Sequence, residues 1–397
     1  MALTAESLLP WLTLRLPAYI AALEQLCAID SPTGHRPGID ATGQWAEQWA
    51  AARGWNIRRF PDAQAGDGLA FTVHGTGRLR VLLAAHMDTV YPVGTAAARP
   101  LRREGGRLVG PGSADNKGGL LSALYAVEAL AALAPQSFGT LSVVCGSDEE
   151  RNSRASRAML EALAPAYDLA LVMEPARANG DIVSARKGSG VFVLDVTGRA
   201  AHAGVEPERG VNAIVALAHQ IVALQALNGL RPGVTVNVGV IAGGEAPNVV
   251  PAQARALVDV RAARPEDMAP VTAAVEAIAA REVVAGAVTQ VSGGWTFAPM
   301  ARTPAIGRLA DLARACAGEL GFTLGDTATG GASYANLLAG LGMPVLDGLG
   351  PVGGQYHGPD EYIEQASIVP RIALVALLIA RANADGFGET APGPQGA

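Results

Sequence analysis

Cysteine, charge and basic clusters are all scarce in this chain of 397 residues. Its three cysteines, Cys27, Cys145 and Cys316, are isolated and form no CxxC pair, so neither a disulfide framework nor a cysteine-ligated zinc site is expected. Only 17% of the residues are charged, the formal net charge is -6, and no basic run occurs. Nucleic-acid binding depends on clusters of lysine and arginine, so this composition argues against a nucleic-acid partner.

The sequence also lacks the patterns of a signal peptide and of a membrane span. No basic start precedes the apolar N-terminal run, and Glu6, Pro10 and Arg15 interrupt it. We therefore expect no signal peptide and a cytoplasmic location. Residues 368–382 are strongly apolar, but Pro370 interrupts them and they are fewer than the roughly 20 residues of a transmembrane helix, so no membrane role is expected.

The apolar content of the chain is sufficient for two domains. Half of the residues are hydrophobic, which is typical of a folded chain, and a single core stops growing near about 250 to 300 residues. Residues 1–187 and 299–397 alternate strand-like and helical runs, as crossover units on a parallel sheet do. Residues 188–298 combine short strand-like runs with two helical runs. We predict an α/β domain, with a mostly parallel sheet flanked by helices, into which an α+β domain is inserted.

The predicted elements follow this division. In the larger domain we expect strands over residues 80–85, 140–145, 169–173 and 344–346, and helices over residues 117–133, 153–163, 309–320 and from residue 367. In the inserted domain we expect strands over residues 191–197, 235–241 and 254–261, and helices over residues 211–227 and 265–281. The glycine- and proline-rich tail from Asp385 is expected to lack a fixed structure.

His86 and Asp88 come just after the strand predicted at residues 80–85, in the motif HMDTV. On an extended chain a spacing of two places both side chains on one side, so Asp88 can accept a hydrogen bond from the imidazole. Such a carboxylate fixes the tautomer of a metal-binding histidine. An HxD pair also occurs at protein surfaces by chance, so the pair alone does not establish a site.

Acidic residues follow other predicted strands or precede a helix. Asp115 lies in GPGSADNKGG before a helix, where capping is the ordinary role of an aspartate. Glu149 and Glu150 end CGSDEE, directly after a predicted strand. Three consecutive acids repel one another unless a cation offsets them, although a solvated turn would also accommodate them.

Two further candidates complete the set. Glu174 ends the strand ALVM, and His357 lies in GGQYHGPDEY beyond the strand at residues 344–346. All these candidates fall at or beyond carboxyl ends of strands, where open α/β sheets place their sites. Histidines and carboxylates without cysteine suit zinc, cobalt or manganese, and a carboxylate that is free to bridge suits two ions about 3.5 to 4 Å apart. The sequence predicts a two-metal site, with zinc as the first choice.

Five motifs resemble those of the family 20 metallopeptidases, which include glutamate carboxypeptidases, aminoacylases, acetylornithine deacetylase and succinyl-diaminopimelate desuccinylase. In chain order they are HMDTV, GPGSADNKGG, GSDEE, MEP and DGLGPVGGQYHGPDEY. The similarity covers residues 30–380 and is greatest to the glutamate carboxypeptidase-like branch. GRAAHAGVEPERGVNAI resembles the lid and dimerisation segment of this family, which implies a homodimer formed through the inserted domain.

The resemblance implies a di-zinc catalytic domain with two Zn²⁺ per chain, for which Co²⁺ or Mn²⁺ could substitute. Asp115 would bridge the two ions. One ion would also bind His86 and Glu174, and the other Glu150 and His357.

The resemblance also implies three catalytic roles. Glu149 would be the general base, which suits a carboxylate that adjoins a ligand without being one. Asp88 would orient His86. His202, in AAHAG, matches a lid histidine that stabilises the tetrahedral oxyanion in the partner subunit, and a surface histidine is the alternative.

Substrate contacts are expected from the lid and from a glycine-rich segment. Asn248 in GGEAPNVVP and Arg261 in VDVRAARPED match lid contacts of members that remove a C-terminal amino acid. Arg261 could equally be a structural ion-pair partner. Gly331, in GGASYAN, completes the predicted contacts.

The sequence departs from the family pattern at two places. Phe297 stands where the carboxylate-binding arginine is expected, with Arg302 nearby but out of register, and Tyr334 stands where many relatives carry aspartate. Arginine is the preferred bidentate partner of a carboxylate. Its loss weakens the case for a strict glutamate carboxypeptidase and favours an aromatic or apolar substrate group beside Trp295 and Phe297.

We therefore expect a zinc-dependent hydrolase that cleaves an amide bond of an N-acyl amino acid or short peptide, with water activated by metal and Glu149 as general base. A dipeptidase or a biosynthetic N-deacylase of the same family would use the same chemistry. A non-catalytic, metal-binding ligand sensor is the alternative from a different class. Metal storage does not require Glu149, so its presence argues against a sensor.

Overall fold

The computed structural model describes residues 3–387, and its contacts divide the chain into two compact units. The first unit comprises Met1–Ser184, Arg302–Ala328 and Ser333–Ala397, and the second comprises Ala185–Ala301 and Thr329–Ala332. The boundaries expected from the sequence differ from these by three residues on each side of the insertion. The tail expected to lack fixed structure lies, beyond Phe387, outside the described residues.

Residues 329–332 are a correction to the predicted division, which placed Gly331 in the larger domain. The amide of Lys187 donates to the carbonyl of Thr329 at 3.0 Å, and the Arg186 guanidinium donates to the carbonyl of Gly331 at 2.9 Å. These contacts tie the segment to the second unit. Sequence position alone could not indicate such a return of the chain.

A six-stranded sheet forms the centre of the first unit, in the order β1-β2-β6-β3-β7-β14. Strands β6, β3, β7 and β14 run parallel to their neighbours within this group, and β1 and β2 pair antiparallel at one side. The carboxyl ends of the four parallel strands therefore meet at one edge. The strand bounds are β1 (Asn56–Phe60), β2 (Gly68–His74), β3 (Arg80–His86), β6 (Thr140–Gly146), β7 (Leu169–Val172) and β14 (Val345–Leu346).

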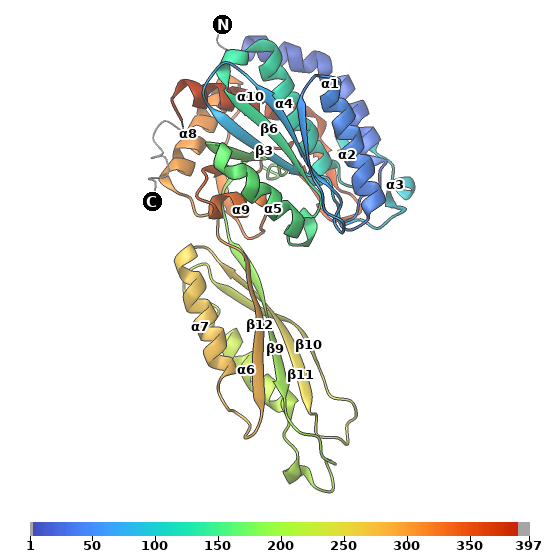
Figure 1. The fold of residues 1–397 in the computed structure, drawn as a ribbon, viewed down its shortest axis with the longest axis vertical. Helices are drawn as coiled ribbons and strands as arrows, with labels where there is room; N and C mark the ends of the chain where they lie inside the picture. Colours follow the sequence, from blue (N-terminus) through green and yellow to red (C-terminus); the bar gives the residue numbers. More distant parts are fainter. Residues whose placement is uncertain (1–2, 388–397) are drawn as a thin grey trace. The chain divides into compact units, whose positions relative to one another are not determined.

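Helices cover both faces of this sheet. The crossovers from β3 through α4 (Gly119–Leu133) to β6, and from β6 through α5 (Arg154–Leu163) to β7, run in opposite directions along the sheet. Because such crossovers are right-handed, the two helices lie on opposite faces (Figure 1). The other helices are α1 (Ala5–Cys27), α2 (Arg36–Ala51), α3 (Thr95–Ala98), α8 (Pro304–Glu319), α9 (Tyr334–Gly340) and α10 (Gln365–Ala384).

The C-terminal helix α10 is longer than the apolar segment of residues 368–382 that the sequence indicated, so the expectation that it is too short to span a membrane is wrong. It is 20 residues long, because it starts at Gln365 and continues through Pro370, so it has the length and apolar composition of a membrane span. However, 67% of its most apolar window is buried inside the protein, and it packs against α1, α4 and α8. These contacts are those of a core helix.

A small sheet and a ribbon were not predicted. The sheet has the order β15-β16-β5-β4 and joins residues 102–109 to residues 353–364, which are far apart in the sequence. Its strands are too short to show periodicity. The bounds are β4 (Arg102–Glu104), β5 (Arg107–Val109), β15 (Gly353–Gly354) and β16 (Tyr362–Glu364), and the ribbon pairs β8 (Ile182–Arg186) with β13 (Asp326–Thr329).

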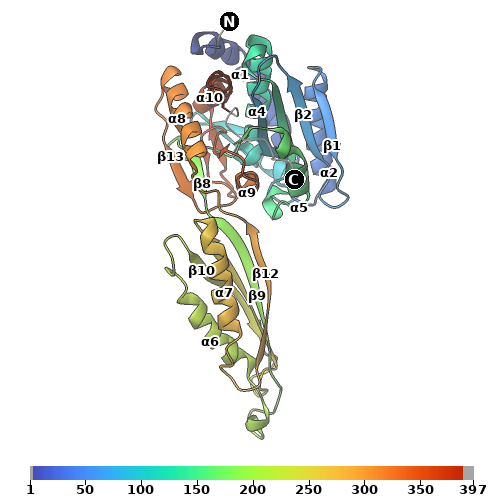
Figure 2. The ribbon, with the colours of Figure 1, turned by 60° about the vertical axis from the view of Figure 1, so that its left-hand side comes forward.

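The second unit is a four-stranded antiparallel sheet in the order β10-β11-β9-β12, with two helices on one face (Figure 2). Alternate residues of β9 and β11, such as Leu194 opposite Ala256, point into a core against these helices. Strand β12 was not predicted, because Gly293 and Gly294 interrupt its apolar pattern. The bounds are β9 (Gly188–Thr197), β10 (Thr235–Gly243), β11 (Gln253–Ala262), β12 (Val288–Phe297), α6 (Ala213–Gln225) and α7 (Met268–Ala279).

Candidate active site

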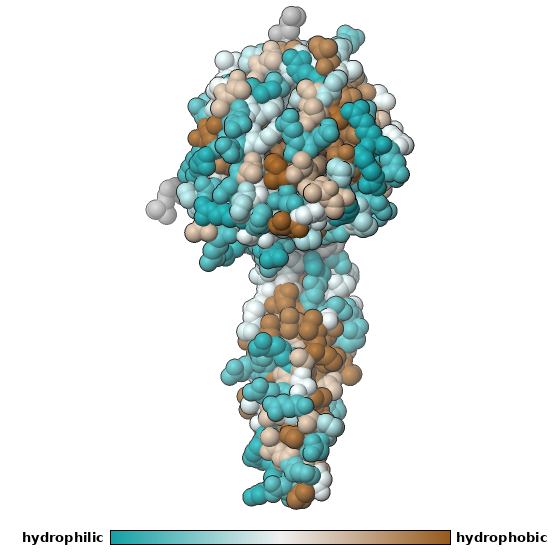
Figure 3. All heavy atoms as spheres, turned by 90° about the vertical axis from the view of Figure 1, so that its right-hand side faces the viewer, coloured by the Kyte–Doolittle hydropathy of each residue, from teal (hydrophilic) through white to brown (hydrophobic). Residues whose placement is uncertain are grey.

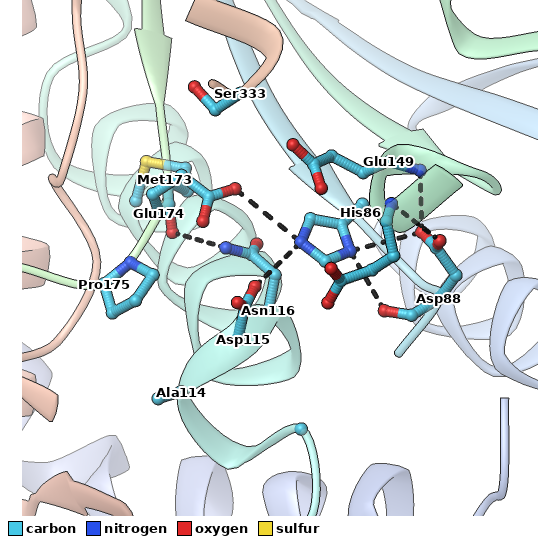
Figure 4. A network of polar contacts seen from close by, with 12 residues as sticks. His86, Asp88, Ala114, Asp115, Asn116, Glu149, Met173, Glu174, Pro175 and Ser333 are labelled. Atoms are coloured by element: carbon cyan, nitrogen blue, oxygen red, sulfur yellow. Dashed lines mark hydrogen bonds and ion pairs between the residues drawn. The ribbon is translucent and has the colours of Figure 1, made fainter. Parts of the chain in front are cut away.

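His86 is the last residue of β3, and its ring lies between two acidic groups. Its Nδ1 is 3.0 Å from the carbonyl oxygen of Asp88 and 3.2 Å from Oδ1 of the same residue. Its Nε2 faces the other way, 2.9 Å from Oδ1 of Asp115 and 3.6 Å from Oε1 of Glu174 (Figure 4). With Nδ1–H donated to Asp88, a deprotonated Nε2 would present its lone pair to a metal ion on the side of the other carboxylates.

Asp88 is fully buried, and it also binds the loop that follows the neighbouring strand β6. Its Oδ1 accepts from the amide of Glu149 and its Oδ2 from the amide of Glu150, both at 3.1 Å. Oδ2 also accepts from the hydroxyl of Thr33 at 2.6 Å. The carboxylate therefore fixes the loop that carries the two glutamates, in addition to the histidine that the sequence predicted it to orient.

Asp115 lies between the two histidines, in the turn before α4. Its Oδ1 faces His86, and its Oδ2 is 3.4 Å from Nε2 of His357. The same His357 nitrogen is 3.3 Å from Oε2 of Glu150. Potential ligand atoms of His86, Asp115 and Glu150 all lie within 4.8 Å of one another, so these residues could hold a metal ion. One carboxylate oxygen directed at each histidine is the arrangement that a bridging ligand requires.

The charges of this cluster are unbalanced. Burial, followed by the charge of Asp115, raises the pKa of Glu174 well above its usual value, and burial raises the pKa of Glu149 to about 8. Burial would also raise the pKa of Asp115, but hydrogen bonds from both histidines hold it below the ordinary value. Hydrogen bonds to Asp115 and Glu150 raise the pKa of His357 to about 10. Crowded buried carboxylates of this kind indicate a site for positive charge.

Two buried carboxylate oxygens test whether metal ions fit. Within the described part of the chain, Oε1 of Glu150 and Oε1 of Glu174 are buried and accept no hydrogen bond. A buried carboxylate oxygen without a donor is costly, and a coordinated cation removes that cost. The donor set of carboxylate oxygens and imidazole nitrogens is one that zinc, cobalt and manganese accept. The residues therefore fit the metal site that the sequence predicted.

Tyr334, which departs from the family pattern, lies beneath this cluster. Its ring meets that of His86 edge to face, with centroids 6.3 Å apart, and its hydroxyl donates to Oγ of Ser156 at 2.8 Å. Ser156 in turn donates to Oδ1 of Asp148 at 2.5 Å. The larger side chain is accommodated because residue 146 is glycine: a Cβ there would lie 1.7 Å from the tyrosine hydroxyl.

Glu361 and Tyr91 were not singled out in the sequence. Glu361 is buried, and its carboxylate accepts from the amides of Ala114 and Asp115 at 2.7 and 2.8 Å. The hydroxyl of Tyr91 donates to the same carboxylate at 2.6 Å. In the sequence, Glu361 could be noticed only as an acidic residue four positions after His357. That spacing does not indicate that its partner is the amide of Asp115, 246 residues away.

The remaining candidates lie in the second unit. Nδ1 of His202 accepts a hydrogen bond from the amide of Gly204 at 3.2 Å. The amide of the neighbouring residue Ala203 donates to the carbonyl of Asn248 at 2.9 Å, so the segments that carry His202 and Asn248 lie side by side. Arg261 forms a two-pronged ion pair with Asp259 at 2.9 and 2.8 Å. That pairing favours the structural alternative for Arg261.

The substrate-side aromatic surface expected at Trp295 and Phe297 needs correction. Trp295 packs against the core of the second unit and donates its indole N–H to the hydroxyl of Thr272 at 3.0 Å. Phe297 is only 6% exposed. Arg302 pairs with Asp326 at 3.1 Å. The two aromatic side chains therefore pack inside the protein, and Arg302 is paired with a carboxylate of the protein itself.

Comparison with known proteins agrees with the fold and identifies the family. The model of peptidase family M20/M25/M40 matches residues 82–381. Carboxypeptidase G2 of Pseudomonas sp. (strain RS-16) is 33% identical over 368 residues, which cover 91% of this chain and 89% of that protein. The succinyl-diaminopimelate desuccinylase of Sphingopyxis alaskensis is 30% identical and covers 87% of this chain and 93% of that protein. The Bacillus subtilis YXEP protein, described as a dinuclear metal binding peptidase, matches with a TM-score of 0.70 at 15% identity, over 93% of this chain and 99% of that one.

The fold and the site together define a metallopeptidase-type enzyme that hydrolyses amide bonds. The chain belongs to peptidase family M20/M25/M40. The predictions of this family, of the α/β fold with an additional domain and of an amide-hydrolysing enzyme are confirmed.

The contact between Tyr334 and Gly146 gives a first prediction. Gly146→Ala should lower stability by about 1 to 3 kcal/mol, the usual cost of overpacking a core, because the new methyl group meets the tyrosine ring and hydroxyl. In a Tyr334→Leu background the same change should cost much less, because the flexible Ser156 hydroxyl can rotate away. Thermal unfolding of the four proteins of this double-mutant cycle measures the coupling. Equal costs in both backgrounds would show that the two residues do not compete for space.

Proposed function

We propose that the chain is a two-zinc amidohydrolase of carboxypeptidase type, which cleaves an amide bond of an N-acyl amino acid or short peptide. The observation that carries this proposal is the position of Asp115, with one oxygen toward His86 and the other toward His357. Glu174 lies on the first side and Glu150 on the second, each with a buried oxygen that lacks a donor among the described residues. Two ions would then share Asp115.

Zinc ions bound there would supply Lewis acidity toward the substrate carbonyl and toward a water molecule. Glu149 adjoins the ligand Glu150, and the bond from its amide to Asp88 fixes its backbone. Its carboxylate would accept a proton from the attacking water and pass it to the leaving nitrogen. Asp88 keeps the His86 ring oriented throughout, because its carbonyl and carboxylate both face Nδ1.

The relatives support the substrate class. One is named a carboxypeptidase and another a desuccinylase, and both names describe the cleavage of an amide next to a carboxylate-bearing group. A dipeptidase or a biosynthetic N-deacylase remains within the same chemistry. The three cysteines are unpaired and buried, which suits a reducing compartment, and a cytoplasmic location is part of the proposal.

We also propose that the enzyme is a homodimer formed through the second unit. Strand β10 is at the edge of its sheet, and large apolar side chains are exposed on it and on α6: Val240, Ile241 and Val222 are 53%, 66% and 73% exposed. Figure 3, which views the β10 side, shows hydrophobic residues gathered on this unit. Unpaired edges and apolar patches of this kind are suited to a symmetric partner.

Metal content tests the central proposal. The purified protein should contain close to two zinc ions per chain, should lose activity with a chelator and should regain it with zinc or cobalt, because five ligands supply a complete set. His74→Ala changes an exposed histidine outside the cluster and should keep both ions. Active protein without a transition metal would end this proposal, and bound zinc without hydrolysis of any acyl amino acid or peptide would favour a sensor.

Glu149→Gln tests the general base. The variant should keep its zinc and its substrate affinity but lose at least about 100-fold in kcat, the low end for a missing acid-base group. Glu161→Gln, on the exposed side of α5, is the matched control and should keep full activity. If Glu149→Gln turns over at a rate near that of the unaltered enzyme, Glu149 has no part in proton transfer.

His202→Ala tests the oxyanion role. Zinc content should not change, whereas kcat should fall by roughly 100 to 1,000-fold with a smaller change in KM, because an oxyanion donor acts chiefly in the transition state. Mixing inactive Glu149→Gln chains with inactive His202→Ala chains should restore partial activity, since some mixed dimers combine an intact metal site with an intact His202. If a tagged-subunit control shows chain exchange and no activity returns, the role across the dimer is excluded.

A further inference from the structure

Glu361 is a buried glutamate that the proposed chemistry does not use. It lies four residues after His357, and its carboxylate receives four hydrogen bonds, two on each oxygen. Oε1 accepts from the amides of Ala114 and Asp115 at 2.7 and 2.8 Å. Oε2 accepts from the amide of Gly112 at 3.1 Å and from the hydroxyl of Tyr91 at 2.6 Å. The side chain therefore holds the backbone of the proposed bridging aspartate directly.

The backbone of Glu361 extends this attachment. Its carbonyl accepts from the amide of Gly110 at 2.9 Å, and the following residue, Tyr362, pairs with Val109 across β16 and β5. Residues 109–115 are thus fastened to residues 361–362 by backbone and side-chain bonds. The approach of the Asp115 turn to the His357 segment is fixed along this whole length.

Tyr91 brings in a third segment. Its hydroxyl lies 2.8 Å from the carbonyl of Gly358 as well as 2.6 Å from Oε2 of Glu361. Tyr91 follows Asp88 by three residues, so it belongs to the loop that begins at His86. The three chain segments that carry His86, Asp115 and His357 therefore converge on one buried carboxylate.

Of the two histidine ligands, His357 is the one whose position depends more on contacts with other segments. His86 is the last residue of a central strand and its side chain is 1% exposed, whereas the side chain of His357 is 53% exposed and lies in a loop. The backbone φ of His357 is +61°, a left-handed conformation that is costly for a residue with a side chain and persists only where the surroundings impose it. Contacts outside the loop must therefore set the position of this ligand.

We infer that Glu361 is a positioning residue that sets the separation of Asp115 and His357 and thereby the affinity of the metal position formed by Asp115, Glu150 and His357. This inference rests on the proposed two-metal site. Groups that hold metal ligands in place typically contribute about 10- to 100-fold in metal affinity. The His86 and Glu174 position is held by strands β3 and β7 and depends less on Glu361.

Glu361→Gln tests the inference with little change in shape. The amide oxygen can still accept two of the four bonds, but the NH₂ group faces donors and can accept none. Competition for zinc with a chromophoric chelator should show one of the two zinc ions bound about 10- to 100-fold more weakly, and the other weakened by a clearly smaller factor, because both positions share Asp115. The melting temperature of the chelator-treated protein should stay close to that of the unaltered chain, and excess zinc should restore kcat.

Two variants complete the design. Tyr91→Phe removes one of the four bonds and should weaken the same zinc ion by a smaller factor, and it carries the test alone if Glu361→Gln does not fold. Glu364→Gln makes the same substitution three residues further on, at the end of β16, where the side chain pairs with Arg107, and it should change neither affinity.

If both zinc affinities of Glu361→Gln and of Tyr91→Phe are the same as those of the unaltered chain, the inference is overturned and the proposed function still stands. Loss of both ions together with a lowered melting temperature would also overturn it, because that result describes a general structural role. An unaltered chain that binds no zinc would overturn the proposed function and this inference together.

Discussion

Repulsion among buried and partly buried carboxylates at the carboxyl edge of the parallel sheet is the constraint on which the first unit depends. Asp115, Glu149, Glu150 and Glu174 lie there with two histidines, and burial raises the pKa of each glutamate. Such a cluster stays together only if backbone donors and strand ends hold it and if positive charge offsets it. The two histidines supply part of that charge, and the donor set suits metal ions for the rest.

Buried acids outside the ligand set hold the loops in place by accepting backbone N–H groups. Asp88 accepts from Glu149 and Glu150, and Glu361 accepts from Ala114 and Asp115. Asp148 accepts from the amides of Ala155 and Ser156 at the start of α5. Each acid spans two segments that are remote in the sequence or joined by a tight turn. Charge-assisted bonds to their backbone therefore hold the ligand loops in place, and such bonds are stronger than neutral ones.

The departures from the family pattern have different physical outcomes. Tyr334 is accommodated, because Gly146 leaves room for its hydroxyl and Ser156 accepts its hydrogen bond. Phe297 is absorbed into packing, so it provides no new substrate surface. The residues that recognise a substrate carboxylate in place of the missing arginine are consequently not revealed by the motif that the family uses for this purpose.

The sequence by itself determined the class of fold and the members of the cluster, because both depend on short-range patterns. Apolar runs marked β3, β6 and β7, and His86, Glu149 and Glu174 were recognisable because each follows such a run. Only the tertiary structure decided which residues support them. Glu361 and the Asp115 turn are 246 residues apart, and Tyr91 reaches Glu361 across 270 residues. Contacts of this range leave no periodic signal in the chain, since they arise only when separate loops meet at the end of the folded sheet.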